Sequence, residues 1–266
     1  MQDALSIILP AYNEEANIET ATRRALSVGR EITAAYEVII VNDGSRDRTR
    51  EVAEALARQY YPQVRVLNHL QNRGYGAALR TGFGHARYDL IFFTDSDNQF
   101  DVSELKYFLP LMRHYDIMTG FRVYRFDPVL RSIISWCWNR LVGILFRLRV
   151  RDVDCAFKIF RREALDKLTV ECDNFFVCTE LLAKARKWNF RIGEKGVRHY
   201  PRMAGETTVR ASDIPRTLRE VFRMWQRIYF PNARQLRSMR RKPRPDNNVV
   251  EFHPTAGAER AGHTGR

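Results

Sequence analysis

Two aspartates separated by one residue, Asp95 and Asp97, follow the apolar run Leu90–Thr94 and point most directly to chemistry. In a strand, residues two apart point to the same face, so both carboxylates can reach one point beyond the strand's carboxyl end. Open α/β sheets bind their ligands at that edge. Adjacent negative charges repel unless a cation lies between them, and carboxylate oxygens suit Mg²⁺ or Mn²⁺. The pair therefore predicts a divalent-metal site with Gln99 as a further ligand, although a solvated acidic turn has the same pattern.

Two other polar segments follow predicted strands, residues 10–15 (PAYNEE) after the first and residues 42–45 (NDGS) after the second. A carboxylate only accepts hydrogen bonds, so Asp43 suits the imide N–H of uracil or the N1–H/N2–H edge of guanine. The structural alternatives are a helix cap at Asn13 or Glu14 and a simple turn at Asp43. Because three such segments occur in this order, we predict a nucleotide site where the strands end.

The elements that must position these residues alternate between short apolar runs and helical patterns. We expect buried strands at Leu5–Leu9, Glu37–Val41, Val64–Asn68, Asp89–Thr94 and Asp116–Thr119. Helices are expected over Glu14–Val28, Asp47–Tyr60, Gly76–Ala86 and Ser103–His114, the last with Ser103 as its N-cap. This alternation predicts an α/β fold with a mainly parallel sheet, flanked by helices and joined by right-handed crossovers.

The pattern changes in the second half of the chain. The expected elements are one or two helices over Val129–Val150, a strand within Asp152–Phe160, a helix over Phe176–Lys187, a strand within Phe190–His199 and a basic amphipathic helix over Ile214–Tyr229. From about Lys242 onward the sequence is rich in proline, polar and charged residues with little apolar content, which predicts a disordered tail.

Composition limits the classes of protein to consider. The net charge is +13, and between Arg216 and Arg244 ten basic residues face one acid, Glu220. Such a segment attracts anionic lipid or nucleic acid. The four cysteines show no Cys-x-x-Cys spacing, which is typical of a reduced compartment. The first residues do not resemble a signal peptide, and arginines interrupt the apolar stretch Val129–Val150, so we expect no membrane span.

Taken together, these segments resemble glycosyltransferase family 2, and within it the dolichol- or polyprenyl-phosphate mannose synthases and their bacterial relatives. The matching segments are PAYNE at 10–14, NDGS at 42–45, NRGYGAALRTG at 72–82, DSDNQ at 95–99 and FKIFRRE at 157–163. The resemblance covers about residues 5–210 and implies a GT-A type nucleotide-diphospho-sugar fold. It implies that the nucleotide is held by Pro10, Tyr12, Glu14, Asp43, Gly76 and Asp95. It also implies that Asp95, Asp97 and Gln99 hold the metal and the diphosphate. Gly74 and Gly76 serve either to let the backbone approach the donor or to pack a helix closely.

A polyprenyl phosphate acceptor is already anionic at neutral pH, so it can attack the sugar's anomeric carbon without a general base. It needs neutralisation and alignment, which arginine supplies through a planar fork that matches phosphate. The resemblance places acceptor-phosphate arginines at Arg122 and Arg131, with Arg202 as a third candidate. We expect Asp97, Arg122 and Arg131 to carry catalysis by stabilising the leaving diphosphate, and a single displacement to invert the anomeric centre.

Two segments depart from the mannose synthase pattern. Residues 152–157 read DVDCAF where those enzymes have DxxSGF, and residues 205–208 read GETT where they have GESK. The donor therefore stays open among UDP-GlcNAc, UDP-GalNAc, UDP-glucose and GDP-mannose. For Asp152 and Asp154 we weigh contacts with sugar hydroxyls, the ordering of an arginine, and a structural turn or ion pair. Glu180 is a candidate base only if the acceptor is a hydroxyl, and a structural role is favoured.

Two stretches have the composition of helices that lie on a membrane. Within Ser132–Arg151 an apolar stripe runs opposite arginines; its residues are Ile134, Trp138, Leu141, Leu145 and Leu148. Phe222–Tyr229 is a second such stretch, and a helix with one face in the protein core is the alternative for both. We expect peripheral binding to an anionic membrane surface at the cytoplasmic face, helped by a small integral-membrane partner. The predicted organisation is a glycosyltransferase domain over 1–212 that contains interface helices at 129–151, a basic helix at 213–241 and a disordered tail at 242–266.

Three other functions compete with this prediction. A family 2 transferase acting on a saccharide or protein hydroxyl requires a working base. A sugar-1-phosphate nucleotidyltransferase usually carries a glycine-rich basic loop after its first strand, which is absent here. A basic nucleic-acid-binding protein explains the C-terminal charge but not the acidic strand ends, and no recognised binding motif is present. We therefore predict a metal-dependent polyprenyl-phosphate sugar synthase with a nucleotide-sugar donor and no nucleic-acid partner.

Overall fold

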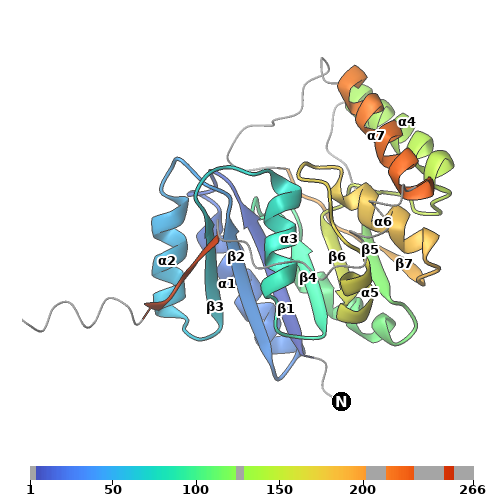
Figure 1. The fold of residues 1–266 in the computed structure, drawn as a ribbon. Helices are drawn as coiled ribbons and strands as arrows, with labels where there is room; N and C mark the ends of the chain where they lie inside the picture. Colours follow the sequence, from blue (N-terminus) through green and yellow to red (C-terminus); the bar gives the residue numbers. More distant parts are fainter. Residues whose placement is uncertain (1–3, 124–128, 202–213, 231–248, 255–266) are drawn as a thin grey trace, which may run out of the picture.

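The fold is one mixed sheet covered by helices on both faces (Figure 1). The computed structural model describes residues 4–123, 129–201, 214–230 and 249–254, with only the backbone at 129–134 and 214–217. Within these residues the strands are β1 (Leu5–Ala11), β2 (Tyr36–Asn42), β3 (Val64–His69), β4 (Leu90–Thr94), β5 (Ile117–Arg122), β6 (Phe157–Arg161), β7 (Ile192–Val197) and β8 (Val249–Phe252). Their order is β7-β5-β6-β4-β1-β2-β3-β8. β6 runs antiparallel to β4 and β5, β8 runs antiparallel to β3, and the other neighbours are parallel.

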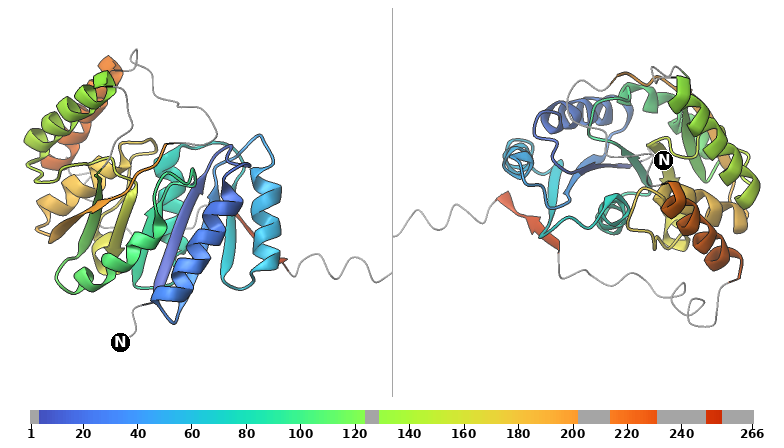
Figure 2. Two further views of the ribbon diagram at one scale, coloured as in Figure 1. Left: turned by 180° about the vertical axis from the view of Figure 1, so that it is seen from behind. Right: turned by 90° about the horizontal axis from the view of Figure 1, so that it is seen from above.

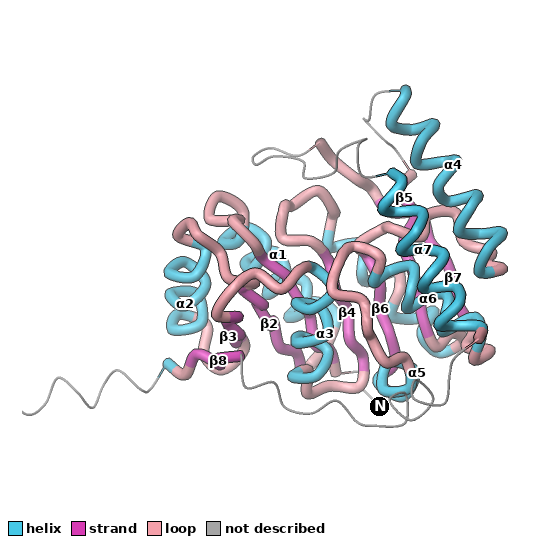
Figure 3. Tube along the Cα trace, turned by 45° about the horizontal axis from the view of Figure 1, so that its top comes forward, coloured by secondary structure: helices cyan, strands magenta, loops and turns pink. Residues whose placement is uncertain are grey.

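The helices form a layer on each face of the sheet. They are α1 (Ile18–Ile32), α2 (Thr49–Gln59), α3 (Tyr75–His85), α4 (Val129–Phe146), α5 (Arg162–Lys167), α6 (Val177–Lys187) and α7 (Ile214–Tyr229), with 3₁₀ turns η1 (Val102–Tyr107) and η2 (Leu109–Arg113). Seen from above, α1 and α3 lie on opposite faces of the strands (Figure 2). α4 and α7 lie side by side beyond the β7–β5 half of the sheet (Figures 1 and 3).

The central strands are apolar because helices cover them on both faces. Every residue of β1 and of β4 is buried, as are six of the seven residues of β2. A strand covered on both sides needs apolar residues at successive positions instead of alternating ones. For this reason the predicted strands of the first half are confirmed to within about three residues, and the predicted α/β fold is confirmed as well.

The region expected to form a helix over Ser103–His114 instead forms the 3₁₀ turns η1 and η2. Pro110 lies at the start of η2 and has no N–H to donate, so a continuous α-helix cannot pass through it. The N-cap is Asp101, whose side chain accepts the Ser103 N–H at 3.1 Å. The prediction of Ser103 as the cap was therefore wrong, and the Ser103 hydroxyl also donates to Asp101.

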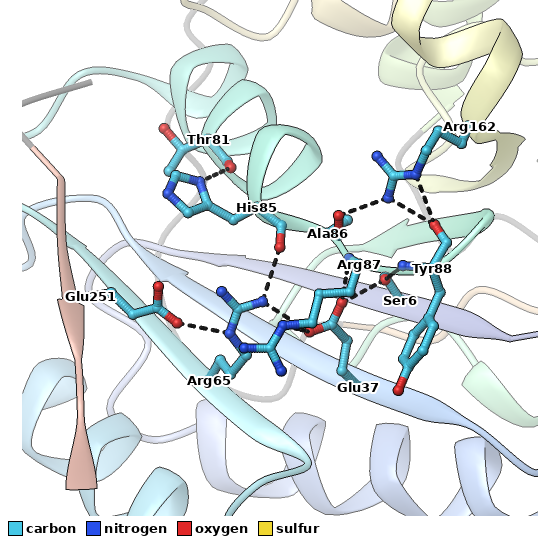
Figure 4. Close-up of polar contacts among 10 residues, drawn as sticks. All are labelled: Ser6, Glu37, Arg65, Thr81, His85, Ala86, Arg87, Tyr88, Arg162 and Glu251. Atoms are coloured by element: carbon cyan, nitrogen blue, oxygen red, sulfur yellow. Dashed lines mark hydrogen bonds and ion pairs between the residues drawn. The ribbon is translucent and has the colours of Figure 1, made fainter. Parts of the chain in front are cut away.

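The prediction of disorder from residue 242 onward was wrong for the segment that forms β8. This strand pairs antiparallel with β3, with Val66 opposite Phe252. Arg65 of β3 donates to Glu251 at 2.7 Å and to Glu37 at 2.9 Å (Figure 4). Glu37 is almost fully buried and also accepts bonds from the Ser6 hydroxyl and the Arg87 N–H. Residues 249–252 thus form a strand because they can pair with the open edge of β3 and because the partly buried Arg65 binds Glu251.

The α4 stripe does not face outward as predicted. Trp138 packs against Phe176 with 5.7 Å between ring centroids, Leu145 packs against the core, and Leu148 is buried. The side chain of Ile134 lies outside the described part of the chain. Among the α4 side chains that the structure describes, the exposed large apolar residues are Trp136, Leu141 and Ile144, so Leu141 is the one exposed member among the four described residues of the predicted stripe. None of the helices in the described ranges is long and apolar enough to cross a membrane.

Candidate active site

The three polar segments meet at the carboxyl ends of β1, β2 and β4, as the strand order requires. The parallel register places Ala11 beside Asn42. Beyond the strands, the Asn13 N–H donates to the Ser45 hydroxyl at 3.0 Å. The Ser96 hydroxyl donates to the Pro10 carbonyl at 2.7 Å. Each segment is therefore tied to its neighbour by hydrogen bonds that run between loops.

In the segment 10–15, Tyr12 is 38% exposed, and hydrogen bonds hold Glu14 in place. The Glu14 N–H donates to the Thr49 hydroxyl at 2.8 Å, and the Glu14 carboxylate accepts from the Asn17 amide at 2.7 Å. The charge of Glu14 raises the pKa of Asp95, which indicates that the carboxylate lies near the aspartate pair. The nucleotide contacts expected of Pro10, Tyr12 and Glu14 stay predictions.

Asp95 and Asp97 form a like-charged pair at the end of β4. Burial, and then the charge of Asp97, raise the pKa of Asp95 to about 7. The Tyr75 hydroxyl donates to Asp95 at 2.8 Å, while Asp97 accepts the Gln99 N–H at 3.1 Å. The side-chain amide of Gln99 donates to the Tyr200 carbonyl at 3.0 Å. A divalent cation would relieve the repulsion that keeps Asp95 from ionising at its ordinary pH.

Asp95 and Asp97, which both follow the end of β4, are suitable ligands for such a cation. Over the described ranges, no group of three or more His, Cys, Asp or Glu side chains could hold a metal ion. Asp95 and Asp97 can therefore supply two carboxylates, with Gln99 beside them, and other ligands have to come from outside this set. Mg²⁺ and Mn²⁺ commonly keep positions for water and substrate phosphates. The chemistry of the donors fits the predicted metal, whose ligands stay a prediction.

Asp43 is buried and orders the loop before α3. One carboxylate oxygen accepts the Arg73 N–H at 2.9 Å and contacts His69 Nδ1 at 2.6 Å, while the other accepts the Gly74 N–H at 2.8 Å. The second ring nitrogen of His69 contacts the Thr81 hydroxyl at 2.9 Å. The predicted contact of Asp43 with a base stays a prediction. His69 was not predicted as a site residue, and its only signal was its position directly after the predicted strand Val64–Asn68.

Gly74 and Gly76 allow the start of α3 to touch the loop before α6. Gly74 has a φ of +97°, and a Cβ there would lie 2.3 Å from the Asp173 carbonyl oxygen. A Cβ on Gly76 would lie 2.1 Å from the Cys172 carbonyl oxygen. The Gly76 N–H donates to the Asp173 carbonyl at 2.9 Å. These contacts match the close-packing alternative, and a contact between Gly76 and the nucleotide stays a prediction.

Arg122, at the end of β5, is held by Asp152 in a two-bond pair. Its Nε and Nη2 donate to the two carboxylate oxygens at 2.6 and 2.9 Å. Burial lowers the pKa of Arg122, but Asp152 raises it overall. The charge of Arg122 lowers the pKa of Asp95, so the guanidinium lies near the pair Asp95 and Asp97. Of the alternatives for Asp152, the structure shows the ordering of an arginine. The phosphate-binding role of Arg122 stays a prediction.

Glu180 has the structural role favoured above. Its carboxylate accepts the N–H groups of Glu171 and Cys172 at 3.0 and 2.9 Å and the Lys184 ammonium at 2.6 Å. Glu180 as a whole residue is 3% exposed. A carboxylate with these partners is a poor candidate for a general base.

The two other predicted acceptor arginines lie outside the described residues. The backbone of Arg131 belongs to α4 but its side chain is not described, and Arg202 falls in the range 202–213. Tyr75 was missed as a site residue although it stands inside the NRGYG segment. Its signal was present, because an aromatic hydroxyl between two glycines at a helix start can reach the strand ends.

Comparison with known proteins agrees with this geometry. The family model for glycosyl transferase family 2 matches residues 6–169. Glycosyltransferase AglD of Haloferax volcanii is 33% identical over 84% of this chain and 37% of its own length. The dolichyl-phosphate beta-glucosyltransferase of Drosophila melanogaster is 30% identical over 90% of this chain and 79% of its own length.

A solved structure shows the same fold. Glucosyl-3-phosphoglycerate synthase of Mycobacterium tuberculosis, crystallised with Mn²⁺, UDP and phosphoglyceric acid, has a TM-score of 0.66. The match covers 87% of this chain and 80% of that chain at 20% identity. The expected GT-A type fold is thereby confirmed. The chain spans little more than a third of the Haloferax protein and most of the Drosophila protein.

Proposed function

The chain belongs to glycosyl transferase family 2, and from this membership we propose that it is a metal-dependent inverting hexosyltransferase. The proposed reaction moves a sugar from a nucleotide-diphospho-sugar to a membrane polyprenyl phosphate. One observation carries the proposal: the like-charged pair Asp95 and Asp97 lies near a positioned arginine, Arg122, at the edge where the strands end. The first group suits a metal-bound diphosphate, and the second suits a phosphate acceptor.

In the proposed mechanism, Asp95 and Asp97 hold the metal and Arg122 holds the acceptor phosphate. A bound Mg²⁺ or Mn²⁺ would neutralise charge on the leaving diphosphate. An acceptor oxygen forms a bond to the anomeric carbon while the bond from that carbon to the diphosphate breaks. No proton has to be removed from the attacking phosphate. The bidentate pair with Asp152 fixes the guanidinium, which reduces the entropy lost when the phosphate is bound.

The proposed acceptor lies in a membrane, and the α4–α7 face offers a surface for it. We define this face by the exposed residues Trp136, Leu141 and Ile144 of α4, Leu218 and Phe222 of α7, and Phe230 just after it. Exposed arginines lie among them at 140, 219, 223 and 227. Apolar side chains with interspersed arginines suit insertion among anionic headgroups. We propose peripheral attachment at the cytoplasmic face, with a small integral-membrane partner as a further proposed component.

A transferase acting on a saccharide or protein hydroxyl is the second candidate. It requires a base, and the engagement of Glu180 by Lys184 and two main-chain N–H groups counts against the residue first considered. A basic nucleic-acid binder does not account for a metal-suited pair of carboxylates. The phosphate acceptor is therefore the proposal that fits these contacts best.

The test is transfer of radiolabel from UDP- and GDP-sugars to polyprenyl phosphate, with Mg²⁺ or Mn²⁺, in membranes that contain the protein. UDP-glucose comes first in the panel because the Drosophila relative is named a beta-glucosyltransferase. We expect a mild-acid-labile glycolipid that disappears in Asp97→Ala. The control is Asp166→Asn, an exposed aspartate on α5. Transfer to a soluble hydroxyl instead of the lipid would support the second candidate.

A further inference from the structure

We propose that Asp154 binds a hydroxyl group of the donor sugar, and that the carboxylates around it select a neutral sugar over an anionic one. This inference rests on the proposed function, because it requires a nucleotide-sugar donor. It concerns the donor sugar and not the acceptor, so it can be tested independently of the proposal that polyprenyl phosphate is the acceptor.

Asp154 lies in the same acidic region as the metal-binding pair. Thr94, the last residue of β4, lies opposite Phe157, the first residue of β6, in an antiparallel pair, so Asp154, just before β6, and Asp95, just after β4, lie at the same end of the sheet. Burial, together with the charges of Asp154, Asp95 and Asp152, also raises the pKa of the Cys178 thiol at the start of α6 to about 12, which agrees with this placement. A sugar attached to a diphosphate at Asp95 and Asp97 reaches this region from the strand ends.

Asp154 has an acceptor oxygen without a protein partner. Its Oδ1 is buried, and in the described part of the chain no group donates a hydrogen bond to it. Trp138 of α4 donates to the carboxylate and so fixes its orientation. Buried carboxylate oxygens rarely lack partners, because an unmet acceptor costs stability. An oxygen of this kind beside a candidate substrate site is explained if a ligand supplies the missing donor.

The neighbouring charged groups are already engaged. Asp152 is paired with Arg122 through both carboxylate oxygens. Lys158 is fully buried and its ammonium donates to the carbonyls of Val153 and Cys155. Of the two aspartates in the segment that departs from the mannose synthase pattern, Asp154 is thus the one with an oxygen left for a ligand.

The chemistry of the region defines the class of sugar. A carboxylate accepts hydrogen bonds, and sugar hydroxyls donate them. A uronic acid would bring its own negative charge near Asp95, Asp152 and Asp154. Of the cations close by, Lys158 is fully buried and donates to two carbonyls, and Arg122 is the cation proposed to bind the acceptor phosphate. Like charges at short range in a poorly hydrated site repel strongly, so a neutral hexose is favoured.

The experiment measures donor binding by calorimetry with Mn²⁺ and no acceptor. Dissociation constants are determined for UDP-glucose, UDP-glucuronate, deoxy analogues of UDP-glucose and UDP alone, or for the GDP series if GDP binds. We expect Asp154→Asn and Asp154→Ala to weaken the nucleotide-sugar about 10- to 100-fold, as for the loss of a hydrogen bond to a charged group. UDP alone should bind both variants as it binds the natural chain.

The deoxy analogues identify the hydroxyl involved. One analogue should bind the natural chain about 10- to 100-fold more weakly than UDP-glucose and should bind Asp154→Ala no more weakly than UDP-glucose does. Glucuronate should bind the natural chain more weakly than glucose, and Asp154→Asn should narrow that gap. Asp166→Asn is the matched control, and circular dichroism verifies folding.

The inference would be overturned if, for every deoxy analogue, the loss of binding affinity caused by the missing hydroxyl added fully to the loss caused by Asp154→Ala. Equal weakening of UDP itself would also overturn it, since that result indicates a structural role. If donor binding behaves as expected while no lipid product forms, the acceptor in the proposed function is wrong and the assignment of Asp154 stands.

Discussion

Single residues at the strand ends act through their neighbours. Asp95 is bonded by Tyr75 and repelled by Asp97, and Arg122 is fixed by Asp152. These contacts position the arginine and the two carboxylates of the proposed cation site before any substrate arrives. A site arranged in advance loses less entropy and needs less reorganisation when its ligands bind.

Metal affinity should depend on pH through Asp95. Its pKa of about 7 lies above the ordinary aspartate value because burial and Asp97 disfavour the charged form. Below pH 7 a proton therefore competes with the metal, and Mn²⁺ affinity should fall by about tenfold per pH unit. Above pH 7 the affinity should level off. Titration with Mn²⁺ followed by electron paramagnetic resonance from pH 5 to 9 measures this dependence.

In the absence of metal, ionisation of Asp95 lowers the free energy of unfolding of the protein. Because its folded pKa is raised, the folded state holds the proton that the unfolded state loses, so stability should fall as pH rises from about 4 to 7. Asp95→Asn should remove that part of the fall and weaken Mn²⁺ binding at every pH. An Mn²⁺ affinity that is flat between pH 5 and 8 would contradict this account of the pair.

At the scale of elements, β8 closes an edge of the sheet that would otherwise be exposed. Arg65 links it to β2 by bonding both Glu251 and Glu37, and Arg58 lies over the Phe252 ring, 5.1 Å from its centroid. An uncovered edge strand is a template for pairing with other chains. The register also places Val249 opposite His69, whose ring contacts Asp43.

Breaking the link between β3 and its neighbours should destabilise the protein in a graded way. Arg65→Met should lower the free energy of unfolding by about 3 kcal/mol, because it leaves the buried Glu37 with only the more distant and exposed Arg87 as a cation in the described part of the chain. Glu251→Gln, at a more exposed partner, should cost about 1 kcal/mol. Urea unfolding followed by circular dichroism measures both values.

Arg50→Met provides the matched control, since Arg50 pairs with Glu54 on the exposed surface of α2. It should change stability by less than about 0.5 kcal/mol. Equal losses in Arg65→Met and Arg50→Met would show that β8 and Glu37 do not depend on the buried arginine.

Considered as a whole, the molecule places the carboxyl ends of β1, β2 and β4 at the same end of the sheet as the α4–α7 pair (Figure 1). The Trp138 indole bonds Asp154, and the Asn174 amide donates to Glu220 of α7 at 2.8 Å. The helices that carry the proposed membrane face are thus bonded to the segment before β6 and to the loop before α6. If the proposed membrane attachment holds, these bonds keep the proposed acceptor site close to the membrane surface.

Replacing exposed aromatic residues on the α4–α7 face should weaken membrane binding. Trp136→Ser with Phe222→Ser should reduce binding to phosphatidylglycerol-containing vesicles at least about tenfold, because each side chain loses about 1.5–3 kcal/mol of apolar burial. Co-sedimentation with vesicles at two salt concentrations measures the loss and its electrostatic part. Tyr61→Ser is the control, since Tyr61 is 61% exposed and lies outside this face. An equal loss in the control would place the membrane surface elsewhere.

The sequence by itself determined the sheet of the first half and the meeting of three polar segments at one edge. Strands covered on both faces must be apolar at every position, and this pattern is local and visible without a structure. Parallel strands bring their carboxyl ends to one side, so Asp43, Asp95 and Asp97 could be grouped from chain order alone. The same local reasoning found α7 at its observed bounds, because its amphipathic period extends over the whole helix.

Only the tertiary structure decided which polar groups pair across long distances. Glu251 lies 186 residues from Arg65, and Asp152 lies 30 residues from Arg122, so no local pattern connects them. The direction of the α4 stripe likewise depends on what packs against it, since an apolar stripe suits a protein core as well as a membrane. Local residue types set which surfaces need a partner, and the packing of the whole chain determines which partner each one receives.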